Sequence, residues 1–176
     1  MPQRDRDIAM MRAALEQARQ ASAIHEVPIG AVVYREGEIL GAAHNRREID
    51  ADPTAHAEIL ALRQAAKRVG SWRLDGCGLA VTLEPCPMCA GALVNSRIDE
   101  VVYAAPDPKM GAVDTLYHLC SEPRFNHRLA VRAGVLADES VAELRAFFRA
   151  RRGKGPPIKP RPVIEPGELG EDWQGG

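Results

Sequence analysis

The sequence has no long apolar run and no marked excess of charge of either sign. No window approaches the roughly 18 unbroken apolar residues of a membrane-spanning helix, and the polar start, Met1 to Ile8, lacks the apolar core of a secretory signal. We therefore expect a cytoplasmic protein without a membrane partner. The formal net charge of the 176 residues is -1, so a polyanionic partner would have to bind to a local basic patch.

Cysteine is scarce, with four residues in the whole chain. Disulfide bonds are rare in the cytoplasm, so these cysteines need another explanation. Cys77 and Cys120 stand alone in the sequence and are expected to be ordinary buried thiols. Cys86 and Cys89 are three residues apart, a spacing that suits the binding of one metal ion.

The length of the chain is that of one domain, and its hydrophobic fraction of 45% is typical of a globular protein. The composition changes at Gly153, where Gly153-Lys154-Gly155-Pro156-Pro157 opens a segment rich in proline and glycine. Such a segment cannot bury enough apolar surface to order itself. We expect a folded domain over residues 1–152 and a disordered extension over 153–176.

Apolar periodicity predicts helices that alternate with short strands. The expected helices cover 7–23, 54–69, 87–95 and 138–152, with a short one near 113–120. The expected strands cover 30–34, 39–43, 79–83, 100–104 and 129–135. The first two strands are separated by four polar residues, which favours an antiparallel hairpin. The fold class is therefore α/β, with three α/β/α layers around a mixed five-stranded sheet.

The last predicted helix combines an apolar face with a basic end. Asp138 is expected to cap its start. Three residues are expected to face inward, namely Val141, Leu144 and Phe148. Phe147 falls outside this stripe and is expected to be exposed. The helix closes with Arg149, Arg151 and Arg152; a phenylalanine pair beside arginines favours single-stranded RNA, which is held by stacking and phosphate contacts.

The residues that carry chemistry stand in two short segments, His56-Ala57-Glu58 and Pro85-Cys86-Pro87-Met88-Cys89. A Cys-x-x-Cys pair at the start of a helix places two sulfurs within reach of one ion, and the helix N-terminus favours their thiolate form. A histidine supplies a third ligand. Three nitrogen and sulfur ligands plus a water are typical of catalytic zinc, whereas structural zinc is usually closed by a fourth protein ligand.

Glu58 is the candidate for proton transfer. Attack of water on an aromatic carbon that bears an amino group requires a proton on a ring nitrogen and another on the departing amine, and one carboxylate can deliver both in turn. Residues i and i+2 do not share a helix face. His56 and Glu58 can therefore converge only near a helix N-terminus, and a site where two helix N-termini meet would allow it.

The pattern H-x-E followed by P-C-x-x-C is the signature of the zinc-dependent nucleobase deaminases. The sequence resembles in particular the bacterial tRNA adenosine deaminases, over roughly residues 7–152. The resemblance is carried by these segments: Val27-Pro28-Ile29-Gly30-Ala31, Asn45-Arg46, Asp52 to Ile59, Val81 to Cys86, Met88-Cys89-Ala90-Gly91-Ala92 and Phe147-Phe148-Arg149.

This resemblance implies a cytidine deaminase-like fold, one zinc ion per subunit and a homodimer. The implied reaction is hydrolysis of the wobble adenosine of a tRNA anticodon stem-loop to inosine. By the same resemblance, Asn45 matches the residue that contacts the adenine, and Asp107 matches an acidic residue near the target ribose. Asp107 stands between Pro106 and Pro108, which depart from the familiar pattern and stiffen the loop.

Each assignment has a plainer alternative. Asn45 could cap the following turn, Asp107 could be a turn residue, and the arginine run could be a solvated helix end. His44, His118 and His127 are rival ligands, although each is typical of a loop or core histidine.

Two other functions also remain open. One is a deaminase of a free base or nucleoside such as guanine or cytosine. The other is a non-catalytic zinc-binding subunit that only binds tRNA. Such a subunit would not need Glu58 as a proton shuttle.

Overall fold

A computed structural model describes residues 2–152. The predicted disordered extension over 153–176 lies outside the described residues, as does Met1. The described chain runs through α1 (Gln3–Ala23), β1 (Gly30–Arg35), β2 (Glu38–His44), α2 (Ala57–Val69), β3 (Gly78–Leu83), α3 (Pro87–Asn95), β4 (Glu100–Ala105), the 3-10 turn η1 (Leu119–Ser121), β5 (Ala130–Ala133) and α4 (Ala137–Arg151). None of these helices is both long and apolar enough to cross a membrane.

The five strands form one mixed sheet in the order β2-β1-β3-β4-β5. β1 is antiparallel to both of its neighbours, whereas β3, β4 and β5 are parallel to one another. The predicted hairpin and the mixed sheet are therefore confirmed. Because β1 runs against β2 and β3, its amino end lies at the same sheet edge as the carboxyl ends of β2, β3 and β4, where the functional loops gather.

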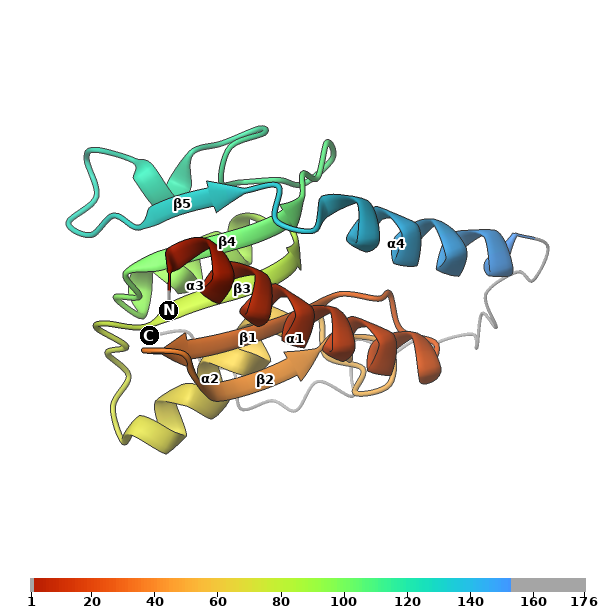
Figure 1. Ribbon diagram of the computed structural model, residues 1–176, viewed down its shortest axis with the longest axis horizontal. Coiled ribbons are helices and arrows are strands. Elements are labelled where there is room, and N and C mark those ends of the chain that lie inside the picture. Colours follow the sequence, from red (N-terminus) through yellow and green to blue (C-terminus); the bar gives the residue numbers. More distant parts are fainter. Residues whose placement is uncertain (1, 153–176) are drawn as a thin grey trace, which may run out of the picture.

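Helices cover both faces of the sheet, with α1 and α4 on one side and α2 and α3 on the other (Figure 1). Side chains alternate between the two layers along each strand, as the pleat requires. Val32, Ala80 and Val102 pack against α1. Their neighbours Val33 and Val81 belong to the core formed with α2 and α3. The predicted three-layer arrangement is confirmed.

The start of α2 differs from the prediction in a way that matters for the site. The sequence predicts a helix from Thr54, but α2 begins at Ala57 with His56 as its N-cap. Asp52 accepts hydrogen bonds from the backbone amide and the hydroxyl of Thr54, both at 2.7 Å, and so holds a local turn that delays the helix. His56 is thereby placed at the very end of α2.

Two expectations in the second half of the chain are wrong in their bounds. The short helix expected near 113–120 is reduced to η1, because the backbone amides of residues 113–115 donate to Glu84 and the segment forms turns instead of a helix. The last strand is four residues long rather than seven, since Gly134 turns the chain with φ of 82°.

The orientation of α4 also corrects the sequence-based expectation. Asp138 lies in the first turn but does not cap it, because Leu136 occupies the N-cap position without a side-chain hydrogen bond. Phe147 is 8% exposed and Phe148 is 49% exposed, which is the reverse of the expectation. Ser140 fixes the rotation of the helix: its buried hydroxyl donates to the Thr82 carbonyl at 2.5 Å, and Phe147 lies two turns further along the same face.

An ion network ties α1 to the parallel strands. Arg132 on β5 donates to both carboxylate oxygens of Asp7, at 2.6 and 3.0 Å, and to Glu100 at 3.0 Å. Glu100 also accepts from Arg6 at 2.7 Å and from the Tyr34 hydroxyl at 2.8 Å. The network joins the start of α1 to β4 and β5. Asp7 is 4% exposed, so its ion pair with Arg132 is largely shielded from solvent.

Candidate metal centre and active site

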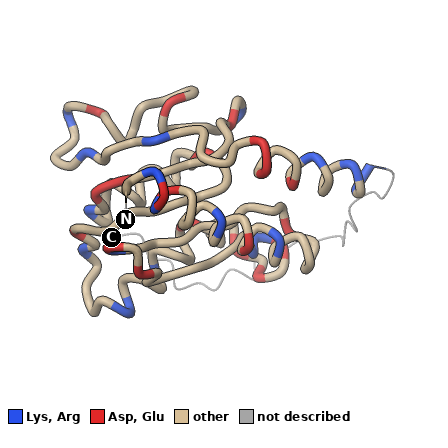
Figure 2. The backbone as a smooth tube through the Cα atoms, viewed as in Figure 1, with Lys and Arg blue, Asp and Glu red and all other residues tan. Residues whose placement is uncertain are grey.

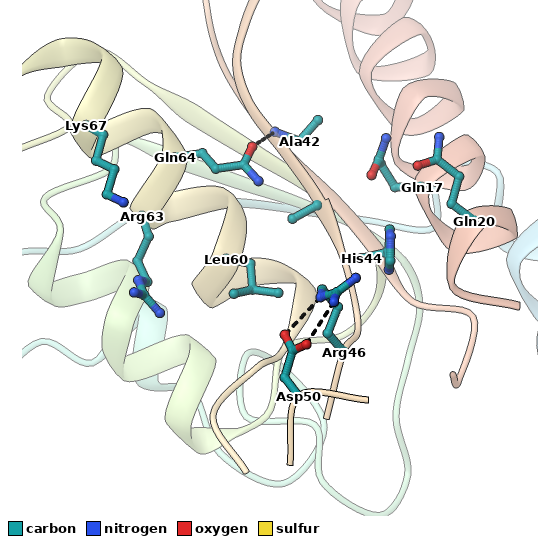
Figure 3. A pocket seen from close by; sticks show the side chains of 11 residues that line it. Gln17, Gln20, Ala42, His44, Arg46, Asp50, Leu60, Arg63, Gln64 and Lys67 are labelled. Atoms are coloured by element: carbon teal, nitrogen blue, oxygen red, sulfur yellow. Dashed lines mark hydrogen bonds and ion pairs between the residues drawn. The ribbon is translucent and has the colours of Figure 1, made fainter. Parts of the chain in front are cut away.

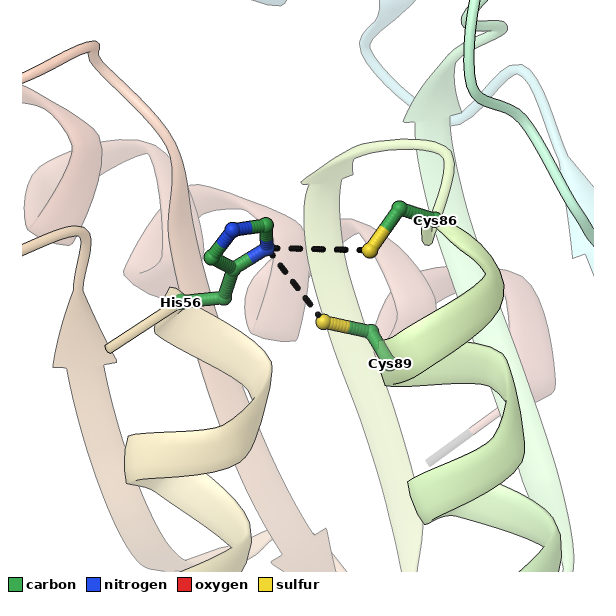
Figure 4. A group of neighbouring side chains, drawn as sticks. All are labelled: His56, Cys86 and Cys89. Atoms are coloured by element: carbon green, nitrogen blue, oxygen red, sulfur yellow. Dashed lines mark hydrogen bonds between the residues drawn. The ribbon is translucent and has the colours of Figure 1, made fainter. Parts of the chain in front are cut away.

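The three predicted ligands converge where two helices begin (Figure 4). His56 is the N-cap of α2 and Cys86 is the N-cap of α3, with Cys89 in the first turn of α3. The His56 Nδ1 atom lies 3.7 Å from Cys86 Sγ and 3.5 Å from Cys89 Sγ. The geometric condition set by the sequence, a site at the meeting point of two helix N-termini, is satisfied.

The spacing of these donor atoms fits a tetrahedral metal ion. Zinc bonds of about 2.3 Å to sulfur and about 2.0 Å to nitrogen imply a nitrogen–sulfur separation of about 3.5 Å, close to both observed distances. The three donors lie within 4.8 Å of one another, and they form the only such group of three among the described residues. One further corner of a tetrahedron would be left for a water molecule or substrate.

The pKa values of the three donor groups reflect this crowding. A hydrogen bond with the Cys89 thiol lowers the pKa of Cys86 to about 4. The hydrogen bond with His56 acts in the same direction, and partial burial of Cys86 opposes both. The hydrogen bond with Cys86 and the burial of Cys89 raise the pKa of the Cys89 thiol. The Cys86 thiolate in turn raises the pKa of His56. The thiolate form of Cys86 is thereby favoured, and a bound cation would favour release of the Cys89 proton as well.

Glu58 lies in the first turn of α2 beside the ligand group, and it is 4% exposed. Its Oε2 atom is buried and has no hydrogen-bond partner among the described residues. Burial raises the pKa of this carboxyl group to about 7. A carboxyl group with an unpaired oxygen and a pKa near neutrality suits both accepting and donating a proton.

A cavity of about 260 Å³ opens over these residues. Its lining includes His56, Glu58 and Cys86 together with residues of four loops at the same edge of the sheet. The predicted residues Asn45, Asp107 and Arg151 line it as well. The cavity thus combines a potential metal centre, a buried acid and several polar side chains around one space.

Asn45 directly follows β2 in the chain and is 6% exposed. Its Oδ1 atom accepts the backbone N–H of Ala57 at 3.1 Å. The side chain therefore does not close the turn that follows it but reaches across to the helix that carries His56 and Glu58. Asn45 is held rigidly at the cavity wall by this bond.

Asp107 lies in the loop after β4. Its Oδ1 atom accepts the backbone amides of Lys109 at 2.9 Å and Met110 at 3.2 Å, which is the geometry of an Asx turn. The alternative interpretation as a turn residue is thus correct as far as these bonds are concerned. Asp107 nevertheless lines the cavity, so the residue is both a turn element and part of the cavity wall.

Sequence reasoning missed two buried carboxylates that hold the loops of this wall. Glu26, 2% exposed, accepts the backbone amides of Glu48 at 2.7 Å and Ile49 at 2.9 Å. Glu84, also 2% exposed, binds the loop that contains Asp107. The available signal was an acidic residue next to apolar residues, which suggests a buried carboxylate. A buried carboxylate requires strong hydrogen-bond partners, and loop amides supply them here.

The aromatic and basic residues at the end of α4 divide into two groups. Arg151 lines the cavity, and its guanidinium lies 5.0 Å above the buried Phe147 ring. Arg149 and Arg152 are exposed and do not line the cavity. Phe148 is exposed, and its ring meets Phe147 edge-on at 5.4 Å. Basic positions gather on the last turns of α4 (Figure 2).

A second hollow, of about 530 Å³, lies between α1, the edge strand β2 and α2 (Figure 3). Arg63 and Lys67 border it, one helical turn apart, and neither forms an ion pair within the described residues. Arg46, by contrast, is paired with Asp50 through two hydrogen bonds of 2.8 Å. We call this hollow the α1–α2 groove. The segment after β2 contributes to both spaces, with Arg46 in the groove and Arg47 in the cavity.

The remaining histidines and cysteines have other surroundings. The His44 ring nitrogen Nδ1 lies 3.0 Å from the Asn45 carbonyl oxygen, and His127 Nε2 lies 2.7 Å from that of Ile98. Cys77 and Cys120 are buried, as expected. Within the described residues none of these belongs to a group of three potential ligands, and neither does His118.

Comparison with known sequences gives one consistent result. The model of the MafB19-like deaminase family matches residues 5–152. A tRNA-specific adenosine deaminase of Bacillus subtilis (strain 168) is 51% identical over 148 residues, which is 84% of this chain and 92% of the relative. The tRNA-specific adenosine deaminase of Haemophilus influenzae is 47% identical, over 83% of this chain and 85% of the relative.

Solved structures separate two groups of relatives. A tRNA:A34 deaminase, studied for A-to-I editing at the wobble position of transfer RNA, is 43% identical with a TM-score of 0.74, covering 77% of this chain and 99% of the other. Guanine deaminase from Nitrosomonas europaea is 29% identical with a TM-score of 0.67, covering 81% of this chain and 84% of the other. The chain is thus more similar to the RNA-editing enzyme than to this deaminase of a free base.

Proposed function

The chain belongs to the MafB19-like deaminases and, among them, to the tRNA-specific adenosine deaminases, and we propose that it hydrolyses the wobble adenosine of a tRNA anticodon to inosine. One observation carries the proposal: the buried Oε2 atom of Glu58, which has no hydrogen-bond partner within the described part of the chain, lies at one cavity beside the group formed by His56, Cys86 and Cys89. This arrangement suits hydrolytic deamination, in which water replaces the amino group at C6 of adenine and ammonia is released.

We assign His56, Cys86 and Cys89 as ligands of one zinc ion per subunit. The donor set is the His/Cys/Cys type that favours zinc, and its spacing leaves one position open. Bound zinc lowers the pKa of a water molecule to about 7 and so supplies a nucleophile at neutral pH. The helix N-termini that carry Cys86 and His56 stabilise the negative charge of the thiolates.

Glu58 acts as the proton shuttle. Its carboxylate accepts one proton from the attacking water and delivers it to the ring nitrogen of the base. It then passes the second proton, from the hydroxyl now bonded to C6, to the amino group, whose bond to C6 breaks as it leaves as ammonia. Burial supports this role, because it raises the pKa of Glu58 to about 7, where both protonation states are accessible. The fixed position of Glu58 in the first turn of α2 keeps it beside the reacting atoms.

The substrate contacts follow from the cavity lining and the surrounding surface. Asn45 is proposed to bind the adenine edge, and Asp107 the ribose of the target nucleotide, since both line the cavity. Arg151 at the rim and exposed Arg149 and Arg152 are proposed to bind phosphates. Exposed Phe148 is available for stacking on a neighbouring base, whereas buried Phe147 supports Arg151 from below.

We further propose that the protein acts as a homodimer in the cytoplasm. The resemblance to the bacterial tRNA adenosine deaminases implies a homodimer, and a tRNA substrate is consistent with the cytoplasm. Sedimentation velocity of the purified full chain tests the first statement, because a single species with the mass of one subunit would contradict it.

Deamination of a free base is the second candidate, and the similarity to guanine deaminase supports it. The metal centre and Glu58 would serve that reaction equally well, so the distinction lies in the substrate. A non-catalytic tRNA-binding subunit is a weaker candidate, because it would have no use for a buried carboxyl group with an oxygen that no described residue binds.

The decisive experiment compares four substrates with the zinc-loaded protein. An anticodon stem-loop with adenosine at the wobble position should release ammonia and yield inosine, while free adenosine, free adenine and free guanine should release none. Nucleoside analysis of the RNA and an ammonia assay measure the two products. Turnover of guanine without inosine in any RNA would favour the second candidate, and no turnover with any of the four would favour the third.

A further inference from the structure

Glu84 is a buried carboxylate that belongs neither to the ligand group nor to the reacting centre. It follows β3 directly and precedes Cys86 by two residues, so it is part of the segment that leads into α3. Its backbone N–H donates to the Ala105 carbonyl at the end of β4, at 2.8 Å. The side chain points toward the loop of residues 106–115, which we call the wall loop because Asp107 and Met110 line the cavity.

Both oxygens of Glu84 are bound to the wall loop. Oε1 accepts three successive backbone amides, those of Val113 at 3.2 Å, Asp114 at 2.8 Å and Thr115 at 2.9 Å. Oε2 accepts the Asp107 amide at 3.0 Å and the Thr115 hydroxyl. Five donors from both ends of one loop thus meet on a single side chain, and they bring the two ends together around it.

The loop is shaped to admit this carboxylate. A Cβ atom at Gly111 would overlap the Glu84 carboxylate and the Asp107 carbonyl, so only glycine fits there. The Gly111 amide donates to the Asp107 carbonyl at 2.9 Å, and the Ala112 amide donates to the carbonyl of Pro85 at 2.9 Å. The wall loop is therefore attached both to Glu84 and to the residue immediately before the Cys86 ligand.

We propose that Glu84 is a positioning residue that fixes the wall loop, and with it Asp107, against the substrate next to the metal centre. The proposal rests on the proposed function for the identity of the substrate. An ionised carboxylate offers only acceptors, which matches five converging donors. A glutamine of the same shape would place an N–H2 group where one carboxylate oxygen now accepts. The loop donors on that side would lose their acceptor in a buried site.

The test uses the full-length, zinc-loaded protein and four variants: Glu84→Gln, Glu84→Asp, Thr115→Val and Asp114→Asn. Asp114→Asn is the matched control, because Asp114 lies in the same loop but its side chain accepts from the Tyr103 hydroxyl, at 2.7 Å, and not from another described residue of the loop. Three quantities are measured below the melting temperature of every variant. They are the zinc content, amide hydrogen exchange in residues 107–115, and kcat and KM on the anticodon stem-loop.

We expect Glu84→Gln to retain zinc and to accelerate exchange of the amides of Asp107 and residues 113–115. We expect kcat/KM to fall by about 10- to 100-fold, which is typical of a displaced group near a reacting centre, with most of the loss in KM. Thr115→Val should show a smaller change in the same direction, because the carboxylate remains. Glu84→Asp should recover part of the loss, and Asp114→Asn should keep both the exchange pattern and KM.

Two results would overturn the proposal. One is unchanged exchange in the wall loop of Glu84→Gln, which would mean that the carboxylate does not hold it. The other is accelerated exchange with wild-type kcat and KM, which would leave Glu84 a stabilising role only. A wild-type protein that is inactive on the stem-loop contradicts the proposed function instead, and the exchange measurement still decides whether Glu84 anchors the loop.

Discussion

The Nδ1 atom of His56 lies 3.5 Å from the Sγ atom of Cys89, although the two residues are 33 positions apart in the chain. The two atoms meet because α2 and α3 both begin at the same edge of the sheet. Each helix places its first turn toward the other, so a nitrogen and two sulfurs face one point. The same construction brings Glu58 alongside, since it lies two residues beyond the His56 N-cap.

Removal of both cysteine ligands should abolish metal binding. We expect the Cys86→Ala, Cys89→Ala double variant to be purified without zinc, because one imidazole cannot retain the ion alone. Elemental analysis of the purified protein measures this. Cys77→Ala is the control, since Cys77 is a buried thiol outside the ligand group; it should keep one zinc per chain. Full zinc occupancy in the double variant would show that the ligands lie elsewhere.

Substitution of Glu58 should separate metal binding from turnover. Glu58→Ala is expected to keep its zinc and its affinity for the anticodon stem-loop but to lose about 10²- to 10⁴-fold in kcat, because the proton shuttle is removed. Single-turnover kinetics and a filter-binding assay measure the two properties. Glu139→Gln, on the exposed first turn of α4, should leave both unchanged. Loss of the metal in Glu58→Ala would make Glu58 a ligand rather than a shuttle.

Neutralisation of the basic end of α4 should weaken RNA binding without affecting the metal. We expect the Arg151→Gln, Arg152→Gln double variant to bind the stem-loop less tightly. The slope of log K against log salt should fall by about 0.7 for each phosphate of single-stranded RNA that is no longer neutralised. Arg124→Gln is the control, because Arg124 is already paired with Glu122 at 2.6 Å. An unchanged slope in the double variant would mean that these arginines form only a solvated helix end.

The α1–α2 groove offers a second basic surface next to the cavity. Arg63 and Lys67, which form no ion pair within residues 2–152, are suited to phosphates of the anticodon stem, so Arg63→Gln, Lys67→Gln should raise Kd for a substrate with a full stem. The salt slope should fall by about 0.9 per duplex phosphate that these cations neutralise. Arg68→Gln, on the same helix but paired with Glu38, is the matched control. Equal binding by wild type and the double variant at several salt concentrations would exclude the groove from the RNA interface.

The ion pair between Asp7 and Arg132 should contribute to stability rather than to activity. Asp7→Asn leaves Arg132 partly unpaired near the buried start of α1, and we expect a loss of about 3 kcal/mol in the free energy of unfolding. Urea denaturation followed by circular dichroism measures it. Asp50→Asn disrupts a pair that is exposed to solvent and should lose less than about 1 kcal/mol. Similar losses in both variants would show that burial of the first pair is not decisive.

Local patterns in the sequence, together with the family signature, predicted the class of fold and the group of residues that the structure brings together at the candidate metal centre. Cys86 and Cys89 are neighbours on one helical turn, and His56 and Glu58 are near each other in the chain, so local geometry groups them. Gly70, with φ of 72°, ends α2 where expected. The hairpin and the alternation of strands with helices are likewise local patterns that the sheet preserves.

Only the folded chain selects the side chains that surround the substrate space. Phe147 and Phe148 have equal apolar character, and the docking of Ser140 onto Thr82 selects Phe147 for burial. The bonds of Glu26 and Glu84 join residues more than 20 positions apart, and no periodicity records such long-range pairs. Backbone amides donate to any carboxylate that the fold delivers to them, so their partners become identifiable only when the sheet edge brings the loops together.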